Sequence, residues 1–498
     1  MRRKTKELNT RAYDTLFLFL LVVSIALRFY YFIGLNFSDD QAYVELANRI
    51  KEGTYVLGTD PLSQRIGITY PIAFFYFLLG VSEFSASLYP LISFVALMVI
   101  TYVLTAKMFD KLAALIAAYF LAIFPLFVEY ATMPMGDIPL ALFAALSMLC
   151  FIYARFTHRN TLFLLSGISA GVAYLIKLLG LVILLPLFVY FLIDITTARR
   201  KLRVFKPYLF FLLGVLLAVS FEFTLDFIFT GNPLLRLDAV NYFSSRERLS
   251  YEFNTDLSFY PKLLFPYTFS GYDGYFSFFF YLVAVAIIYF IVKRDNRTTF
   301  LVFWLLVVLL YMQFGTMSLK EWIFMHRLER HLTIILPASS IISAAFLSRL
   351  INRYRYFFLP VTFLILFLLT VKFSQTWSAT HEYHVCAKED LKLVYEVLKR
   401  ERVKTIIADF GEIAHLNFYF GFPHNITFKN PRFTPCSEVH DAYVIINGTR
   451  YWYDVLFRSN KIGECYKKPP KEWKLVKKIK GECGGLFAKY DAAVYYAP

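Results

Sequence analysis

The sequence predicts an α-helical protein that crosses a membrane many times and carries a small soluble α/β domain at its C-terminal end. Of the 498 residues, 58% are hydrophobic and 19% are aromatic, whereas only 18% are charged. Soluble domains carry about 25% charged residues, so this composition excludes a disordered chain and argues against a water-soluble enzyme. Apolar runs long enough to cross a bilayer recur along the chain and stop near residue 373. The residues that follow have the mixed polarity of a soluble domain.

Eleven apolar runs are candidates for transmembrane helices, because about 20 apolar residues are needed to cross a bilayer. They cover residues 14–35, 86–106, 112–131, 137–155, 161–176, 178–195, 206–229, 274–292, 299–315, 332–348 and 355–373. A further run, from Ile68 to Gly80, is too short to cross comfortably and contains Pro71. We predict that this run forms a helix that lies in the membrane interface or re-enters it.

The positions of Lys and Arg predict the orientation of the spans. With eleven spans and a cytoplasmic N-terminus, the short inner segments hold 20 Lys and Arg residues, and the longer outer loops hold 11. Positive charge gathers on the cytoplasmic side of membrane proteins, so this distribution supports the scheme. The formal charge of +16 is then mainly a consequence of topology, and we reject nucleic acid as a partner. We predict a multi-pass protein of the cell membrane with an extracytoplasmic C-terminal domain.

Two domains follow from this scheme. Residues 1–373 form the transmembrane domain, with long outward loops at 36–85 and 230–273. Residues 374–498 form the soluble domain. In it we expect one helix and four strands, at residues 390–400, 404–409, 441–446, 473–480 and 492–496.

Four of the five cysteines lie in the predicted outward domain: Cys386, Cys436, Cys465 and Cys483. In an oxidising compartment they favour two disulfides, with three connectivities open. Free buried thiols are the alternative. A zinc site fits the sequence less well, because no two of these cysteines have the C-x-x-C spacing.

Three carboxylates are expected at the outer face of the membrane. Asp39 and Asp40 follow the first span directly, and Asp137 opens the fourth. Ionisable groups at a membrane boundary are costly and therefore mark candidate functional sites. One of them can act as a general base. The alternative is a structural role, because carboxylates also stabilise the first turn of a helix.

Cations are expected at the same depth. Lys177 lies in a tight turn between two apolar runs, and Arg327, Arg330 and His331 precede the tenth span. Lys and Arg side chains there can hold a phosphate group. They can also extend to the interface or pair with acids such as Glu329 without further function. Because carboxylates and cations from separate spans meet at one face, a substrate with both an apolar tail and a phosphate fits this region.

These residues lie in motifs that resemble the GT-C fold glycosyltransferases, in the branch of protein O-mannosyltransferases and lipid A aminoarabinose transferases. In chain order the motifs are Ser38–Asp–Asp–Gln–Ala–Tyr43, Ile68–Thr–Tyr–Pro71, Met133–Pro–Met–Gly–Asp–Ile–Pro139, Gly171–Val–Ala–Tyr–Leu–Ile–Lys177 and Arg330–His–Leu332 followed by Pro337. The ordered set covers about residues 14–345. Two positions depart from the pattern of this branch, because Asp40 stands where Glu is usual and His331 stands where Tyr is usual.

The resemblance implies transfer of a monosaccharide from a polyprenyl- or dolichyl-phosphate-linked donor to an acceptor hydroxyl at the outer face, with inversion. It implies that Asp39 is the base, that Asp40 supports it and that Asp137 helps to shape the site. It also implies that the donor phosphate is bound by Lys177 and Arg330, with Arg327 and His331 beside them. The sugar stays open, as does the acceptor, which is a protein, a lipid or a glycan. A divalent cation would help the leaving phosphate, but no ligand cluster in the sequence requires one.

Two other classes of function use similar features. A polytopic transporter or lipid flippase would use the same acids as proton or cation sites. Transporters often contain two related halves, and the sequence shows no such duplication. An assembly protein without activity is the third class. Asp39 together with Lys177 and Arg330 argues against it.

The orientation scheme makes a direct prediction. A cysteine introduced near residue 440 is expected to react with a membrane-impermeant thiol reagent added from outside, because eleven spans place this domain outside. The measurement is labelling of intact cells, compared with cells opened by detergent. Labelling from the cytoplasmic side alone would contradict the scheme.

Overall fold

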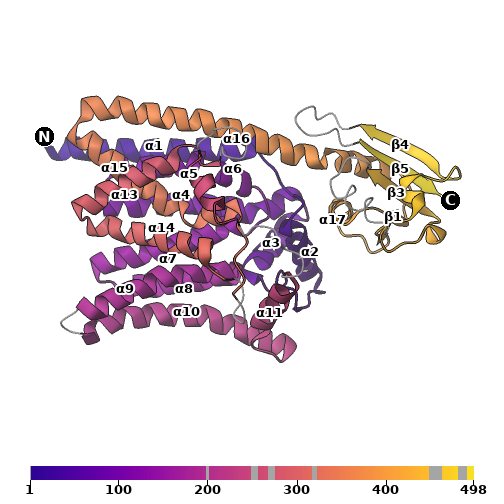
Figure 1. Cartoon of the computed structure of the whole chain (residues 1–498), viewed down its shortest axis with the longest axis horizontal. Coiled ribbons are helices and arrows are strands. Elements are labelled where there is room, and N and C mark those ends of the chain that lie inside the picture. Colours follow the sequence, from indigo (N-terminus) through magenta and orange to yellow (C-terminus); the bar gives the residue numbers. More distant parts are fainter. Residues whose placement is uncertain are drawn as a thin grey trace.

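The computed structural model describes residues 2–197, 201–247, 256–266, 275–316, 322–447, 462–480 and 491–498. A bundle of helices makes up most of the chain, and a small domain with a sheet stands at one end of it (Figure 1). The bundle consists of α1 (Arg2–Tyr30), α4 (Glu83–Met108), α5 (Lys111–Ile123), α7 (Asp137–Thr157), α8 (Asn160–Ile176), α9 (Leu184–Thr197), α10 (Lys201–Thr230), α13 (Phe279–Lys293), α14 (Asn296–Phe314), α15 (Leu336–Arg353) and α16 (Arg355–Leu398).

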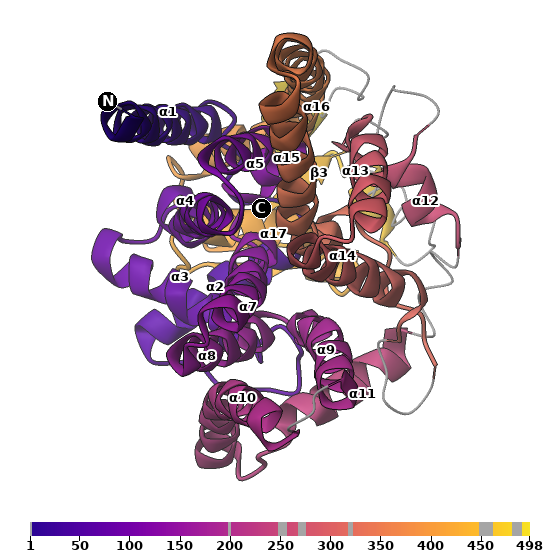
Figure 2. The same ribbon diagram turned by 90° about the vertical axis from the view of Figure 1, so that its left-hand side faces the viewer.

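Each of the eleven predicted spans overlaps helices of this bundle. Within the described residues, seven helices are long and apolar enough to cross a membrane, and shorter apolar helices accompany them. The predicted fold class is confirmed, whereas the number of crossings stays a prediction. Figure 2 shows the bundle end-on, with α15 among its neighbours and α10 at the edge. Accordingly, most side chains of α15 are buried, while many apolar side chains of α10 are exposed.

The predicted span at 112–131 consists of two helices. Helix α5 ends at Ile123, and α6 (Pro125–Tyr130) begins at Pro125, which cannot donate the backbone hydrogen bond that would continue α5. The carbonyl groups at the end of α5 find other donors. The buried guanidinium of Arg28 on α1 donates to Ala122 at 2.7 Å and to Leu121 at 3.3 Å. These bonds satisfy carbonyls that a helix end leaves without partners.

The connection between α8 and α9 is interrupted at Lys177. Its backbone is extended (φ −147°, ψ 143°), and a 3-10 helix, η1 (Leu178–Ile183), follows before α9 begins. Helix α8 also approaches α10 closely. A Cβ atom on Gly167 would lie only 1.9 Å from the carbonyl oxygen of Phe211, and one on Gly171 would lie 2.4 Å from the Cβ of Ala218. Small residues of this kind allow two membrane helices to pack backbone against backbone.

Short helices cover the end of the bundle that faces the sheet domain. They are α2 (Asp39–Glu52), α3 (Ile66–Leu79), α11 (Leu235–Glu247) and α12 (Phe259–Leu264). Helix α3 coincides with the predicted interfacial helix. Phe74, Phe77 and Leu78 on it are exposed. A position at the membrane surface would suit these side chains, and it stays a prediction.

Helix α16 leads from the bundle into the C-terminal domain without a break. The predicted boundary after residue 373 falls inside this helix of 44 residues. The domain itself is a five-stranded sheet of order β2-β1-β3-β5-β4, in which β1 is parallel to β2 and β3, and β5 is antiparallel to β3 and β4. The strands are β1 (Thr405–Ile407), β2 (Thr427–Lys429), β3 (Ala442–Asn447), β4 (Lys474–Lys480) and β5 (Asp491–Ala497).

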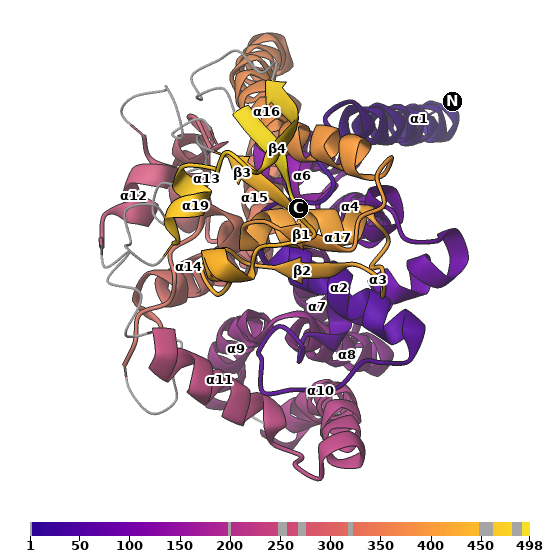
Figure 3. The same cartoon turned by 90° about the vertical axis from the view of Figure 1, so that its right-hand side faces the viewer.

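Four of these strands match the strands expected from the sequence. The short strand β2 was not expected, nor was helix α17 (Phe410–Tyr419), which follows β1. Helix α17 begins at Asp409, which forms a capping box with Glu412. Figure 3 views the molecule from the sheet domain and shows α17 in front of the end of the bundle.

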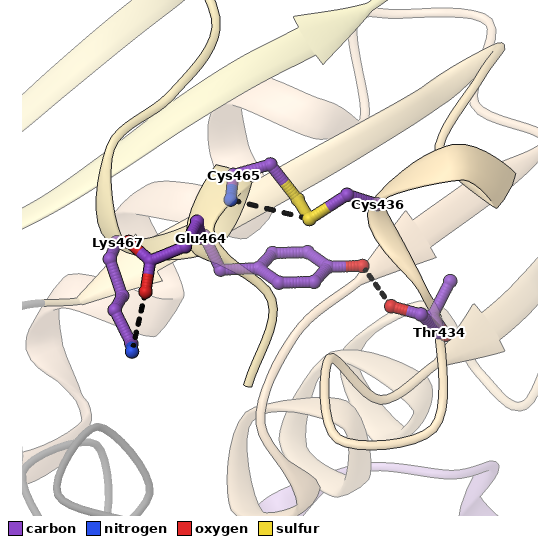
Figure 4. The surroundings of a disulfide bond; sticks show 6 residues. Thr434, Cys436, Glu464, Cys465 and Lys467 are labelled. Atoms are coloured by element: carbon purple, nitrogen blue, oxygen red, sulfur yellow. Dashed lines mark hydrogen bonds and ion pairs between the residues drawn. A yellow bond between two sulfur atoms is a disulfide. The ribbon is translucent and has the colours of Figure 1, made fainter. Parts of the chain in front are cut away.

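A disulfide joins Cys436 to Cys465 (Figure 4). It ties η4 (Cys436–Glu438) to the short helix α19 (Glu464–Lys467), and the Tyr466 hydroxyl beside it donates to the Thr434 carbonyl at 2.9 Å. Cys386 is also disulfide-bonded, while Cys483 lies outside the described residues. Cys150 is a buried free thiol in α7.

Candidate active site

A cavity of about 660 Å³ opens at the end of the bundle, next to α2. Apolar side chains line part of it, among them Leu62, Leu178, Leu179, Val240, Met325 and Leu328. Four charged side chains reach it: Asp39, Arg65, Lys177 and Arg330. The uncharged polar residues of its wall are Ser38, Tyr311, Thr316, His326 and His331. The cavity therefore combines an apolar surface with a concentrated positive charge.

Asp39 is the carboxylate that lines the cavity. It is the first residue of α2, and its side chain is 32% exposed. Its Oδ2 lies 3.3 Å from Nη1 of Arg65 and 3.7 Å from Nη2 of Arg330. Burial acts to raise the pKa of Asp39, but Arg65 and Arg330 outweigh it and hold this pKa below its ordinary value. Asp39 is therefore an ionised carboxylate at neutral pH.

Asp40 has a different role, although it is the next residue. Its side chain is buried and accepts hydrogen bonds from the backbone N–H groups of Asn36 and Ser38, the latter at 3.0 Å. Burial raises the pKa of Asp40 to about 7. The carboxyl group thus closes the loop that precedes α2, and it does not line the cavity.

Ser38 stands directly before α2 but does not cap it through its side chain. Ser38 occupies the N-cap position with an extended backbone, but its hydroxyl makes no capping hydrogen bond. Instead, this hydroxyl lies 3.3 Å from Nη1 of Arg330, which donates to it. Ser38 therefore links α2 to the segment that carries Arg330.

Asp137 and Lys177 form a buried ion pair. Nζ of Lys177 lies 2.7 Å from Oδ1 of Asp137, and the two side chains are 7% and 1% exposed. Asp137 is the first residue of α7, and Lys177 follows the last residue of α8, so the pair joins the ends of two adjacent helices. Lys177 also lines the cavity, whereas Asp137 lies behind it. Asp137 thus holds the Lys177 ammonium in place.

Arg330 and His331 lie together on a 3-10 helix, η3 (Glu329–Ile334). The ring nitrogen Nδ1 of His331 lies 3.0 Å from the carbonyl oxygen of His326, to which it donates. Burial and then the charge of Lys177 lower the pKa of His331 to about 3, so the ring is neutral. In this state His331 adds no positive charge to the cavity, and because its one N–H is bound to His326, its Nε2 can only accept a hydrogen bond.

Arg327 does not reach the cavity. It is buried, and its Nη2 donates to the backbone carbonyl of Gln313 at 3.1 Å, while the guanidinium lies over the ring of Phe324. The prediction grouped Arg327 with Arg330 because they are close in sequence. The chain has no regular secondary structure from Met325 to Leu328, where the backbone is extended before η3 begins, and the two side chains point to different surroundings.

Arg65 was not predicted as a site residue. It precedes α3, donates to the Tyr43 hydroxyl and faces Asp39 across the cavity wall. In the sequence it is one cation in a long polar loop, 26 residues from Asp39. Arg65 reaches the cavity only because α2 packs against α3. The one signal in the sequence is its position directly before an apolar helix.

Metal ligation stays open. Within the described residues, no group of three or more His, Cys, Asp or Glu side chains is arranged to hold a metal ion. Those carboxylates that lie near the cavity pair with cations.

Comparison with known proteins supports the resemblance seen in the motifs. Residues 63–222 match the family model described as dolichyl-phosphate-mannose-protein mannosyltransferase. This segment is about a third of the chain, and it includes Asp137 and Lys177 but neither Asp39 nor Arg330. No curated protein sequence matches the chain.

Solved structures match nearly the whole chain. ArnT from Cupriavidus metallidurans in the apo state is 14% identical, with a TM-score of 0.63 and coverage of 96% of this chain and 97% of that one. The archaeal oligosaccharyltransferase AglB from Archaeoglobus fulgidus, in complex with an inhibitory peptide and a dolichol-phosphate, is 14% identical, with a TM-score of 0.55 and coverage of 97% and 74%. The chain has the GT-C fold.

A second ArnT structure, bound to undecaprenyl phosphate, matches this GT-C chain with 13% identity, a TM-score of 0.59 and coverage of 96% and 97%. At such identities the likeness concerns the fold alone. It confirms the architecture that the motifs predicted, and the roles of the individual residues rest on the geometry of the cavity.

The cations of the cavity lead to a prediction. Lys177→Met and Arg330→Gln are each expected to weaken binding of a prenyl phosphate by about tenfold or more, because each removes a charge-assisted hydrogen bond worth about 1.5–3 kcal/mol. Binding to purified protein is the measurement, with Lys262→Met as the control because Lys262 is an exposed cation on α12. Unchanged affinity in both cavity variants would remove these residues from the phosphate site.

Proposed function

We propose that this protein is a membrane glycosyltransferase that transfers a monosaccharide from a polyprenyl- or dolichyl-phosphate-linked donor to an acceptor hydroxyl at the outer membrane face, with inversion. The observation that carries the proposal is the cavity in which an ionised carboxylate, Asp39, faces a group of fixed cations beside an apolar wall. Such a cavity offers one group that takes a proton and several that receive a phosphate. The GT-C fold supports the same reading.

The charge balance of the cavity supports a monophosphate link. Arg65, Lys177 and Arg330 supply three positive charges, and Asp39 with the ion-paired Asp137 supplies two negative charges, which leaves +1. A sugar linked through one phosphate is a diester with a single negative charge and neutralises this site. A diphosphate link carries one more negative charge and would leave the site negative.

The total charge in the cavity does not change during the proposed reaction. Asp39 takes the proton of the acceptor hydroxyl, whose oxygen attacks the anomeric carbon from the face opposite the phosphate. The bond from that carbon to the phosphate oxygen breaks, and the electron pair leaves with the lipid phosphate. One negative charge thus moves from Asp39 to the phosphate, where Lys177, Arg330 and Arg65 stabilise it. Phosphate is a good leaving group when so held, and no general acid is required.

Donor binding also prepares Asp39 for its role. In the free protein Arg65 and Arg330 stabilise the carboxylate and make it a weak base. A bound phosphate adds a negative charge beside these arginines, and a nearby like charge raises the pKa of a carboxyl group. Asp39 therefore becomes a stronger base when the donor is present.

The choice between the adjacent acids gives a sharp prediction. Asp39→Asn is expected to lower turnover by about 100- to 10,000-fold with near-normal donor affinity, the usual contribution of a positioned general base. Asp40→Asn is expected to cost about 1–3 kcal/mol of stability, because Asn has one acceptor oxygen for the two backbone N–H groups that Asp40 binds, and to lower turnover per folded molecule by much less than Asp39→Asn does.

Turnover, donor binding and thermal unfolding of both variants are the measurements. If Asp39→Asn keeps most of its turnover, the base lies elsewhere, and Asp40 and then Asp137 become the candidates.

The donor class is tested with a panel of purified lipid-linked sugars. We expect transfer from one or more monosaccharides on a prenyl monophosphate and none from the matching diphosphates, because the cavity balances one negative charge. The measurement is release of lipid phosphate together with glycosylation of peptide, lipid or glycan acceptors. Transfer only from diphosphate donors would overturn the charge argument, and no transfer from any donor would overturn the proposed function.

A further inference from the structure

The segment of residues 33–41, which leads from the end of α1 into α2 and is called the loop below, is held by a buried lysine of the long helix α16. Nζ of Lys388 donates to the backbone carbonyls of Ile33 and Leu35, the latter at 3.0 Å, and lies 3.1 Å from Oε1 of Glu83. Its side chain is only 3% exposed. All three ammonium protons thus have an acceptor, and the buried charge is paired.

Glu83 belongs to the first turn of α4 and receives further contacts from the same side. Nζ of Lys392, one turn along α16, lies 3.5 Å from its Oε2, and the Tyr419 hydroxyl of α17 lies 3.3 Å from its Oε1. Lys392 is half exposed, in contrast to Lys388. The two lysines share an acceptor on α4, but only Lys388 also binds the carbonyls of the loop.

Helix α17 of the C-terminal domain contacts the same loop further along. The ring of His415 lies against that of Phe37, with centroids 4.2 Å apart. The amide nitrogen of Gln41 donates to the carbonyl of Gly411 at 3.1 Å and lies 2.7 Å from Nδ1 of His415. Gly411 is closely fitted, because a Cβ atom there would lie 2.9 Å from the Phe37 ring.

These contacts enclose the short segment that ends in Asp39. Lys388 binds the chain at Ile33 and Leu35, and α17 binds it at Phe37 and Gln41. Asp40 closes the segment from within through the N–H groups of Asn36 and Ser38. The bundle also contacts this segment, because Thr132 accepts hydrogen bonds from the N–H groups of Ile33 and Gly34 and Arg330 donates to the Ser38 hydroxyl. Lys388 and α17 are the contacts that come from α16 and the domain that it leads into.

We propose that the C-terminal domain positions the catalytic loop, with Lys388 as the main positioning residue and α17 as the second contact. This inference rests on the proposed role of Asp39 as the base. Lys388 does not touch the cavity. It acts through the backbone that carries Asp39, while the donor site at Lys177 and Arg330 keeps its own supports.

The chemistry of the contact requires a lysine. Its compact ammonium group can turn three protons toward three acceptors that surround a point. An arginine fork is planar and larger, so Lys388→Arg would not reproduce the three bonds. Lys388→Met keeps the length of the side chain and removes every donor.

The experiment compares Lys388→Met with Lys392→Met in the full-length protein. Turnover of Lys388→Met is expected to fall by about 10- to 100-fold, since a displacement of about 1 Å at a catalytic group has an effect of this order. Its affinity for a prenyl phosphate is expected to stay within about twofold. Lys392→Met is expected to match the unmodified protein in both measurements, because it leaves the loop carbonyls bound.

Amide hydrogen exchange distinguishes a local loosening of the loop from a general loss of protein stability. This measurement does not require the protein to be active. The amides of Asn36 and Ser38 are expected to exchange faster in Lys388→Met and unchanged in Lys392→Met, with amides of the α7–α8 region unaffected in both. Unchanged turnover and unchanged exchange in Lys388→Met would overturn the proposal. An equal loss of turnover in both variants would do the same.

A second variant covers the case in which Lys388→Met fails to fold. Gly411→Leu places a side chain against Phe37 from the α17 side and is expected to lower turnover at least tenfold while donor affinity is kept. Unchanged turnover in Gly411→Leu would overturn the role of the domain. If the unmodified protein transfers no sugar at all, the proposed function fails, and the exchange rates alone still decide whether Lys388 holds the loop.

Discussion

The buried ion pair between Lys177 and Asp137 is the interaction on which the site depends. Bringing both charges out of water costs several kcal/mol for each ion, and their attraction repays this only with good geometry. An apolar pair would hold α7 and α8 together at least as well. The role of the ion pair is better explained by the position of the Lys177 ammonium group. Asp137 holds this group at one place in the cavity wall, so that it cannot turn toward water.

The fixed charges of the cavity affect the protonation states of the other titratable groups in its wall. Burial, with the charges of Lys177 and Arg330, lowers the pKa of His331, and Arg330 joins Arg65 in keeping Asp39 ionised. Asp39 is therefore an ionised carboxylate on the wall of the cavity, with three cations and two histidines beside it. Preorganised charges of this kind stabilise a leaving anion without rearrangement during the reaction.

Much of the fold could be predicted from the sequence, because the membrane imposes a simple rule of length and polarity on each helix. The division of the predicted span at 112–131 was missed, since hydropathy does not register that Pro125 starts a new helix. In the C-terminal domain, strand β2 has only three residues and gave no periodic signal.

The sequence located residues of the cavity where they lie at the end of an apolar run, as Asp39, Lys177 and Arg330 do. It gave no signal for Arg65, which reaches the cavity only through the packing of α2 on α3. It grouped Arg327 with Arg330, whereas the Arg327 side chain turns to the Gln313 carbonyl, because closeness in sequence says little about the direction of a side chain.

The close contact of α8 with α10 has a consequence for the shape of the cavity. Gly167 and Gly171 let the two backbones touch, and α10 leads on to α11, which carries Val240 in the wall of the cavity. Arg236 of α11 in turn is paired with Glu222 of α10. The position of Val240 in the cavity wall thus depends on two residues without side chains on another helix. A change at Gly167 or Gly171 would move α10, and with it one wall of the cavity, without touching any of its charged groups.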